Sequence, residues 1–535
     1  MNSFQKFIKA GWCKSSLRMV SSSSSTESRR IPAAWLRQVV EDKSEAPRLY
    51  AWRLANLPDG EQSYARNSPE ASQSETVIIN NTSDDERRRI YILGVGNIGR
   101  LYAIFLAKNN DAQPPPSPPP PITLVVHRRE LLEQWKAHPG IELVRRGDDG
   151  KREVVERNPT FRVEWWTDAQ PTHGPVREPG SGSGVRNLIV ATKAPDAIPQ
   201  VDRVRRYLGG ASTVAFAQNG MCKLWPPLGE AYVAARFGGI TTTTTSSNGE
   251  EEEEMRRGPQ WLACVTTHGV TSLGPFRSVH ASPADVLVGP VMVPGVRHSG
   301  RGSGDGRDDK GSSGISSSSS TSEEDKDRNA SSSRNYLVEQ IVRAPRLNGR
   351  KVATRELWVA QLEKLVVNSV INPLTAVLRC KNGELFEERG DGLKDVVEML
   401  VDEASRTLRA LVAHPSSEGI LSQDEDETGS VIEGTGAAKG SLAKTRGELL
   451  ERFSPARLRT MLHSVGEKVA ANTSSMLQDV RAGKKTEIED FNGWLVETAR
   501  YLGDGSGLPV NEKLISLVVD GAVRTRDELV RELRG

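Results

Sequence analysis

The sequence predicts an α/β fold in which an N-terminal domain built on a doubly wound parallel sheet precedes an all-helical C-terminal domain. In the first half, short runs of β-branched and aliphatic residues alternate with helical segments, as they do in βα units. After residue 350, long segments carry apolar residues at three- and four-residue spacing, the period of an amphipathic helix. These two patterns divide the core of the chain into residues 88–349 and 350–535.

The length and charge of the chain exclude several classes of protein. A chain of 535 residues has room for about two to four domains. Its 71 Lys and Arg nearly balance its 69 Asp and Glu, and the net charge of +2 argues against nucleic acid as a partner. No stretch reaches the roughly 18 consecutive apolar residues of a membrane span, so no membrane partner is predicted.

The four cysteines do not form a metal or disulfide pattern. They lie far apart and make no CxxC pair, which excludes the usual zinc-ribbon spacing and gives no disulfide framework. No metal site is therefore predicted, and a reducing compartment is the simpler interpretation. We interpret Cys222 and Cys264 as ordinary buried thiols.

Only 36% of the residues are apolar, which indicates that part of the chain is not packed in a core. Four low-complexity segments account for much of this. They are rich in Pro, Ser, Gly, Thr or charge and cannot bury enough apolar surface to offset the entropy of ordering. The predicted disordered insertions lie near residues 110–121, 238–259, 299–333 and 414–445.

The N-terminus, residues 1–40, is predicted to be a transit peptide or a disordered leader, followed by an extension at 41–87. Phe4, Ile8 and Trp12 recur at four-residue spacing, within a Ser-rich, basic stretch that has no acidic residue before residue 27. These features are typical of mitochondrial targeting. A mitochondrial location is therefore predicted, with a cytoplasmic one as the alternative.

A GxGxxG motif lies between a β-prone run at 90–93 and a helical pattern at 100–108. In this context the first glycine allows the tight turn, the second lets the backbone approach a pyrophosphate, and the third lets helix and strand pack closely. The helix N-terminus then offers N–H groups to the phosphates. The predicted cofactor-binding residues of this loop are Gly94, Gly96, Asn97, Ile98 and Gly99.

The strand at 122–127 predicts which dinucleotide binds. An NAD enzyme usually has an acidic residue at the end of this strand, but here the strand is followed by Arg128 and Arg129. A guanidinium suits the 2′-phosphate of NADP(H) through bidentate hydrogen bonds. We therefore predict NADP(H) as the cofactor and Arg128 as the contact. The alternative is a pair of solvated surface arginines.

Further strands are predicted at 187–192, 212–217, 261–267 and 286–289. Lys193 and Asn219 follow the first two of them, where a parallel sheet places its ligands, and are predicted to lie near the nicotinamide ribose or a phosphate. Asn219 precedes a glycine and could instead mark a turn. We interpret His268 as a structural hydrogen-bonding residue and not as a catalytic base.

The segment 356–378 has strong helical periodicity, and Lys364, Asn368 and Asn372 lie four residues apart on one face of it. A buried polar stripe needs a ligand or a partner helix, whereas a solvated face is the alternative. Pro373 predicts a kink or a break.

Amphipathic helices are also predicted at 391–411 and 445–471. In the segment 473–494, a helix ends at Gly483 and a capping box at 486–489 starts the next. That prediction places Glu487 in the first turn of the new helix, where a surface carboxylate is also favoured by the helix dipole.

Together these motifs resemble the ketopantoate reductase family (2-dehydropantoate 2-reductase) over roughly residues 88–520, interrupted by the insertions. The matching blocks are GVGNIG at 94–99, HRRE at 127–130, ATKA at 191–194, QNGM at 218–221, KLVVNSVINPLTAVLRCKNGEL at 364–385 and SSMLQDVRAGKKTEIEDFNG at 474–493.

The resemblance implies a Rossmann domain followed by a helical domain, with the active site between them. It implies NADPH-dependent reduction of 2-dehydropantoate to (R)-pantoate, with Lys364 and Glu487 as the catalytic residues. It also implies that the substrate contacts Asn368, Asn372 and Ser475, and that Lys193, Arg128 and Asn219 contact the cofactor. An ammonium at Lys364 would polarise the C2 carbonyl and donate a proton as the hydride arrives.

Two alternatives to this activity stay open. The chain could reduce another small 2-oxo acid, or it could be a non-catalytic NADPH-binding mitochondrial paralogue. Intact Lys364 and Glu487 argue against the second, because a binding protein needs neither. The predicted state is a monomer or a homodimer.

Overall fold

The computed structural model describes residues 38–39, 41–42, 44–58, 83–109, 118–147, 152–182, 184–237, 258–291, 335–422 and 437–534. All but two residues of the predicted leader at 1–40, and most of three of the predicted insertions, lie outside these ranges. The mitochondrial location therefore stays a prediction. The fourth interval, 414–445, is too wide, because residues 415–421 and 437–445 are helical and Ile420 and Leu421 are buried.

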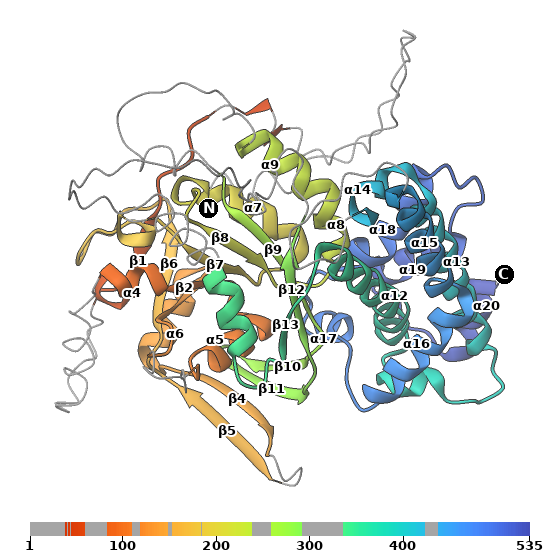
Figure 1. Ribbon diagram of the computed structural model, residues 1–535. Helices are drawn as coiled ribbons and strands as arrows, with labels where there is room; N and C mark the ends of the chain where they lie inside the picture. Colours follow the sequence, from red (N-terminus) through yellow and green to blue (C-terminus); the bar gives the residue numbers. More distant parts are fainter. Residues whose placement is uncertain are drawn as a thin grey trace, which may run out of the picture. The chain divides into compact units, whose positions relative to one another are not determined.

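The central feature is a nine-stranded sheet that confirms the predicted fold class (Figure 1). Its six inner strands are all parallel. Their spatial order corresponds to the strand order 3-2-1-4-5-6 of dinucleotide-binding domains. These strands are β6 (Arg162–Thr167), β3 (Ile122–Val126), β2 (Ile90–Leu93), β7 (Asn187–Val190), β8 (Thr213–Phe216) and β9 (Gln260–Thr266).

Three further strands extend this sheet at its edges. On one side β1 (Tyr50–Trp52) pairs antiparallel with β6, so part of the segment 41–87 belongs to the sheet. On the other side β12 (Val286–Pro290) pairs antiparallel with β9, and β13 (Gly349–Lys351) pairs parallel with β12.

Helices cover both faces of the sheet because its strands are apolar on both sides. In β2 all four residues are buried: Ile90 and Ile92 face one layer of helices, and Tyr91 and Leu93 face the other. The first layer contains α5 (Asn97–Leu106), α6 (Arg129–Ala137) and the helical residues 335–343. The second contains α7 (Ala194–Val204), α8 (Met221–Lys223) and α9 (Gly229–Phe237).

A second, four-stranded sheet was not predicted from the sequence. It has the order β10 (Gly269–Gly274), β11 (Arg277–Ser282), β4 (Ile141–Arg146) and β5 (Glu153–Asn158). Figure 1 shows the β4–β5 hairpin pointing away from the larger sheet. Strands β4 and β5 were missed because charged residues interrupt the β-prone runs, as in the sequence EVVERN of β5.

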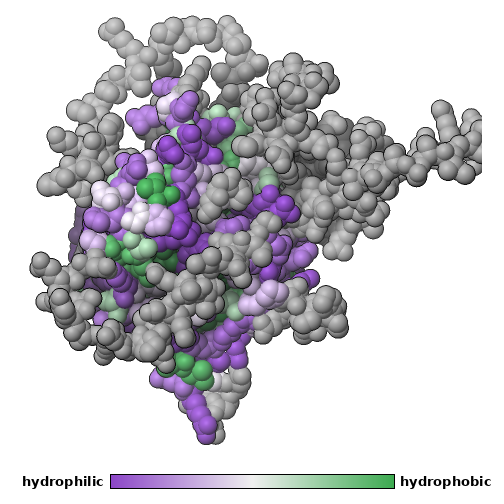
Figure 2. Space-filling view, turned by 90° about the vertical axis from the view of Figure 1, so that its left-hand side faces the viewer, coloured by the Kyte–Doolittle hydropathy of each residue, from purple (hydrophilic) through white to green (hydrophobic). Residues whose placement is uncertain are grey.

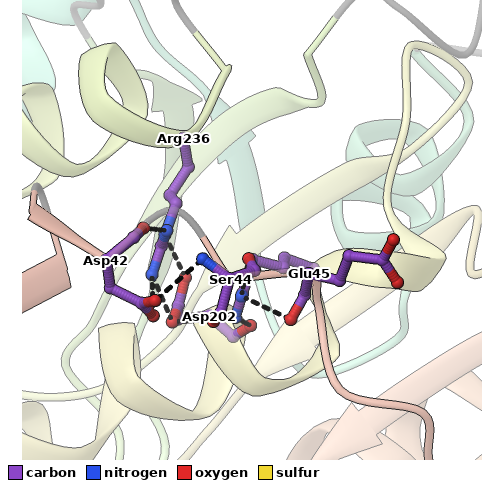
Figure 3. A network of polar contacts seen from close by, with 6 residues as sticks. Asp42, Ser44, Glu45, Asp202 and Arg236 are labelled. Atoms are coloured by element: carbon purple, nitrogen blue, oxygen red, sulfur yellow. Dashed lines mark hydrogen bonds and ion pairs between the residues drawn. The ribbon is translucent and has the colours of Figure 1, made fainter.

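The chain before β1 is fixed to the sheet domain by a polar network (Figure 3). The guanidinium of Arg236 donates to Asp202 Oδ1 at 2.9 Å and to the Asp42 carbonyl at 2.5 Å. A few residues later, the Tyr207 hydroxyl bonds both to the backbone N–H of Leu49, at 2.8 Å, and to its carbonyl, at 3.0 Å. These contacts connect the N-terminal segment to α7, α9 and the turn after α7.

The C-terminal domain is helical, as predicted, and packs around α12. Helix α12 contacts α13, α14 and α16 to α19, and its buried aliphatic side chains form the centre of the core. The helices are α12 (Thr354–Leu378), α13 (Leu393–Ala413), α14 (Glu418–Leu421), α15 (Ala437–Arg452), α16 (Pro455–Lys468), α17 (Ser475–Arg481), α18 (Ile488–Tyr501), α19 (Pro509–Val519) and α20 (Arg526–Arg534).

Helix α12 does not end at Pro373, contrary to one of the two outcomes predicted for that proline. It continues for five residues to Leu378 and is followed by Arg379 in the left-handed region, with φ of 57°. Pro373 and its neighbours Asn372 and Leu374 are buried. Tertiary packing on both sides of the proline thus outweighs the hydrogen bond that it cannot make.

In Figure 2, the described residues that are visible are mostly hydrophilic, and small separate hydrophobic groups lie among them. Large exposed apolar side chains among the described residues are mostly single, such as Val155 and Leu273. No helix in the described ranges combines the length and the hydropathy needed to span a bilayer.

Candidate active site

The glycine motif forms the connection between β2 and α5. Gly94 has φ of +102°, and a Cβ there would lie 2.8 Å from the Ala191 carbonyl group. A Cβ on Gly99 would lie 2.1 Å from the Gly94 carbonyl oxygen, so both positions require glycine. Gly96 directly precedes the helix, and a Cβ added there would have no atom within 4 Å. The space above Gly96 and the unpaired N–H groups of the first helical turn fit a dinucleotide pyrophosphate.

The other two predicted residues of this loop have structural side chains. The Asn97 amide donates to the Val270 carbonyl at 3.2 Å and accepts from the Ser278 hydroxyl at 3.2 Å. Ile98 packs against the apolar layer between α5 and the sheet. Their side chains therefore fix the loop to β10, β11 and the sheet, and a phosphate would be bound by their backbone N–H groups.

Arg128 lies at the carboxyl end of β3, directly before α6. Its side chain is 56% exposed, and within the described residues its ion-pair partner is Glu130, at 4.0 Å. Arg129, in contrast, donates to Glu133 at 2.8 Å and lies over the ring of Trp52. The first arginine is thus the better placed of the two to turn toward a ligand at the end of the strand.

Lys193 connects the two domains. Its ammonium donates to Asp479 on α17 and, at 3.3 Å, to Glu487 at the start of α18. Burial opposes the charged form, but Glu487 and Asp479 outweigh it and raise the pKa of Lys193. A lysine predicted to bind the cofactor is therefore held, in the structure, by carboxylates of the helical domain.

Lys364 reaches from the third turn of α12 to the ends of two strands. Its Nζ donates to Asn219 Oδ1, just after β8, at 2.8 Å, and to the Thr266 carbonyl, at the end of β9, at 2.5 Å. Burial lowers its pKa to about 8, although the negative charge of Glu487 acts in the opposite direction. At neutral pH the amine is mostly protonated and can still give up its proton readily.

Glu487 occupies the position before the first residue of α18, one residue earlier than predicted. Glu487 is only 5% exposed. The capping box expected at 486–489 is not formed, because the N-cap of α18 is Glu487 and its side chain makes no capping hydrogen bond. Instead the carboxylate accepts from Lys193 and, at 3.4 Å, from the backbone N–H of Ala194, the first residue of α7. The N-terminus of a helix favours such a negative charge.

The polar stripe on α12 faces inward. Asn372 is 7% exposed and donates to Asn368 Oδ1 at 3.4 Å, and Asn368 lines a cavity beside Lys364. The stripe is therefore partly buried, which decides against the solvated alternative, and its contact with a ligand stays a prediction. The cavity is lined by Gln218, Asn219, Gly220, Met221, Cys222, Cys264, Val265, Gln361, Lys364, Leu365, Asn368 and Phe491.

Ser475 is half-buried. The described residues that line this cavity do not include Ser475, Asn372 or Glu487. Its neighbour Ser474 is the helix cap of α17: the Ser474 hydroxyl accepts from the Leu477 N–H at 3.1 Å and bonds to Thr375 at 2.7 Å. A substrate contact by Ser475 stays a prediction.

Several lining residues were not assigned to the site from the sequence. Met221, Val265, Leu365 and Phe491 are apolar and look like ordinary core residues, so no pattern separates them from the core. Gln218 lies in the block QNGM, but the resemblance to the family implies no role for it. Cys222 and Cys264 are buried, as predicted, although both also line the cavity.

His268 is structural, as predicted. One of its ring nitrogens contacts His280 Nε2 at 3.0 Å and accepts from the Ala284 N–H at 3.0 Å, while the other contacts the Leu347 carbonyl at 3.1 Å. Burial lowers the pKa of both histidines, that of His280 to about 4. The pair is therefore neutral at physiological pH and connects β10, β11 and the chain before β13.

Two sequence models of one family match the chain. The model described as Ketopantoate reductase PanE/ApbA matches residues 90–292, and the one described as Ketopantoate reductase PanE/ApbA C terminal matches residues 356–520. Every candidate site residue named above lies within these two ranges.

The chain is also similar to several reductases along most of its length. It is 39% identical over 491 residues to "Ketoisovalerate reductase BEA2" of Gibberella fujikuroi, a match that covers 90% of this chain and 95% of the relative. It is 36% identical over 516 residues to a ketoisovalerate reductase of Beauveria bassiana, covering 94% and 98%. A probable 2-dehydropantoate 2-reductase of Schizosaccharomyces pombe is 24% identical over 436 residues, covering 80% and 95%.

Proposed function

Because the chain belongs to the ketopantoate reductase family PanE/ApbA, we propose that it reduces 2-ketoisovalerate to 2-hydroxyisovalerate with NADPH. The class of reaction, NAD(P)H-dependent reduction of a small 2-oxo acid, is that of the family. The observation that carries the proposal is the position of Lys364, whose ammonium lies in a cavity between the strand ends and α12.

Lys364 can provide the acid that protonates the ketone oxygen. NADPH, when bound, supplies a hydride to C2 of the oxo acid. The Lys364 ammonium, oriented by Asn219 and the Thr266 carbonyl, would hydrogen-bond the ketone oxygen and pass its proton to it as negative charge develops there. The neutral amine that remains is then protonated again from solvent, so that one proton and one hydride are consumed per 2-hydroxy acid.

The choice of 2-ketoisovalerate replaces the 2-dehydropantoate predicted from the sequence. It is supported by the relatives at 36–39% identity, which are named ketoisovalerate reductases. It is also supported by the lining of the cavity, where Met221, Val265, Leu365 and Phe491 offer an apolar surface to an isopropyl group.

2-Dehydropantoate is the second candidate. It differs from 2-ketoisovalerate by an added hydroxymethyl group, which needs a hydrogen-bond partner when buried. Asn368 lines the cavity and, through Asn372, continues a polar stripe along α12 that could provide one. The stripe alone does not distinguish the two acids, because either has a carboxylate to place.

A substrate panel tests the proposal. With purified protein and NADPH, we expect kcat/KM for 2-ketoisovalerate to exceed that for 2-dehydropantoate by about tenfold or more, the scale of one mismatched group in a shaped pocket. The measurement is NADPH oxidation at 340 nm, with pyruvate and 2-ketoisocaproate as further acids. A higher value for 2-dehydropantoate would restore the activity predicted from the sequence, and no turnover with any acid would support a binding protein.

We also propose that the dinucleotide is NADPH and not NADH, and that Arg128 selects it. Arg128→Gln should lower kcat/KM for NADPH by about tenfold, the scale of a lost charged hydrogen bond, and leave the value for NADH unchanged. Arg129→Gln is the matched control, because that guanidinium is already paired with Glu133. An equal loss for both dinucleotides in Arg128→Gln would contradict the assignment.

A further inference from the structure

Gln218 has a buried side-chain amide that the fold itself leaves without partners. The residue is 4% exposed, and neither its Oε1 nor its Nε2 has a hydrogen-bond partner within the described part of the protein. An amide has two donors and an acceptor with two lone pairs, and leaving both ends unpaired is costly. Buried polar groups in folded proteins are nearly always paired, so this amide requires an explanation.

The position of Gln218 points to a ligand as the missing partner. The side chain lines the same cavity as Lys364 and Asn368. Gln218 also directly precedes Asn219, whose Oδ1 holds the Lys364 ammonium at 2.8 Å. Gln218 therefore lies beside the ammonium that is expected to protonate the ketone.

The sheet topology indicates which part of the dinucleotide reaches this position. The glycine loop and Arg128 belong to the first half of the inner sheet, β6, β3 and β2, which receives the adenosine half. Gln218 follows β8 in the second half, β7, β8 and β9, which receives the nicotinamide half. The reacting C4 of the nicotinamide must lie next to C2 of the oxo acid, and the carboxamide is attached to the neighbouring ring carbon.

The donor and acceptor pattern distinguishes the carboxamide from the substrate. A substrate carboxylate only accepts hydrogen bonds, so it would pair with Nε2 and leave Oε1 unpaired beside a negative charge. A primary carboxamide both donates and accepts, so it satisfies both ends of the Gln218 amide. We infer that Gln218 pairs with the carboxamide of the bound nicotinamide and orients the ring over the oxo acid.

The inference rests on the proposed use of NADPH, but not on the choice of oxo acid. It is tested by binding without turnover, using calorimetry with NADP⁺ and with its 3-acetylpyridine analogue. The analogue keeps the carbonyl but has a methyl group in place of the amino group. The wild-type protein should bind NADP⁺ about five- to tenfold more tightly, the factor expected for one hydrogen bond.

In Gln218→Met this preference should fall to within about twofold, because the acceptor for the amino group is gone. Gln340→Met is the control: Gln340 belongs to the helical residues 335–343 and does not line the cavity, so its loss should leave the wild-type preference unchanged. An unchanged preference in Gln218→Met would overturn the inference.

A second measurement separates ligand binding from a structural role. Methionine has nearly the length of glutamine, and in the cofactor-free protein it removes no hydrogen bond. The Tm of Gln218→Met without cofactor should therefore be no lower than that of the wild-type protein. A Tm lower by several degrees would mean that the amide has a protein partner, and would overturn the inference. If Gln218→Met loses the preference for NADP⁺ over the analogue but the wild-type protein does not reduce 2-ketoisovalerate, only the substrate proposal fails. If NADP⁺ does not bind the wild-type protein, the cofactor proposal and the Gln218 inference both fail.

Discussion

Lys364→Met should lower kcat/KM for the 2-oxo acid at least about a hundredfold, the scale of a lost general acid. Methionine keeps the apolar stem of the side chain but removes the ammonium that donates to Asn219 and the Thr266 carbonyl. The proton for the ketone oxygen must then come from water, and the developing negative charge loses its nearest cation. The measurement is NADPH oxidation at 340 nm under conditions in which the wild-type protein turns over.

The control for this variant is a lysine of the same domain outside the site. Lys394 on α13 has a side chain that is 62% exposed and lies 3.8 Å from Glu388, so Lys394→Met should retain wild-type kinetics. The dissociation constant for NADP⁺ should change little in Lys364→Met, because the ammonium acts on the ketone. Near-normal turnover in Lys364→Met would remove the lysine from the mechanism.

Glu487→Gln should lower kcat/KM by roughly 10–100-fold at pH 8 through its effect on Lys364. The Glu487 carboxylate raises the pKa of Lys364 against the effect of burial, so neutralising it lowers that pKa further. A lower pKa means that less of the amine carries its proton at a given alkaline pH, and each unit is a factor of ten there. The fall in rate with rising pH should therefore begin at a lower pH in the variant.

Asp479→Asn is the matched control for Glu487→Gln. Both carboxylates pair with Lys193, but only Glu487 is among the charges that act on Lys364. Asp479→Asn should therefore disturb the Lys193 contact and leave the pH dependence in place. If the two variants shifted the pH profile equally, Glu487 would act through Lys193 and the contact between the domains, and not through Lys364.

The sequence was sufficient to predict five of the six inner strands, because they are continuous apolar runs, as in the IYIL of β2 before Gly94. The sixth, β6, was missed because Arg162 and Glu164 interrupt its apolar residues. Strands β4 and β5 of the smaller sheet were missed for the same reason: they mix valine and leucine with arginine and glutamate, and such runs resemble charged loops. Helix α14 was missed because its two buried apolar residues, Ile420 and Leu421, stand beside a polar insertion.

The site was predictable where one element carries it. Lys364, Asn368 and Asn372 are neighbours on α12, and helical spacing alone brings them together. Contacts across the domains were not predictable, because residues such as Lys193 and Asp479 are separated by 286 positions and only the packed fold places them side by side. Gln218 and Phe491 lie in blocks that resemble the family, but only the packed fold shows that both line the same cavity.

The pH dependence of the wild-type enzyme tests most directly the claim that Lys364 is the acid of a 2-oxo acid reductase. Burial lowers the Lys364 pKa to about 8, so the protonated amine predominates below that pH and is lost above it. We predict that kcat/KM for 2-ketoisovalerate reduction is level below about pH 8 and falls tenfold per pH unit above it. Oxidation of 2-hydroxyisovalerate by NADP⁺ needs the neutral amine, so its kcat/KM should rise over the same pH range. A reduction rate that stays level up to pH 10 would contradict this account.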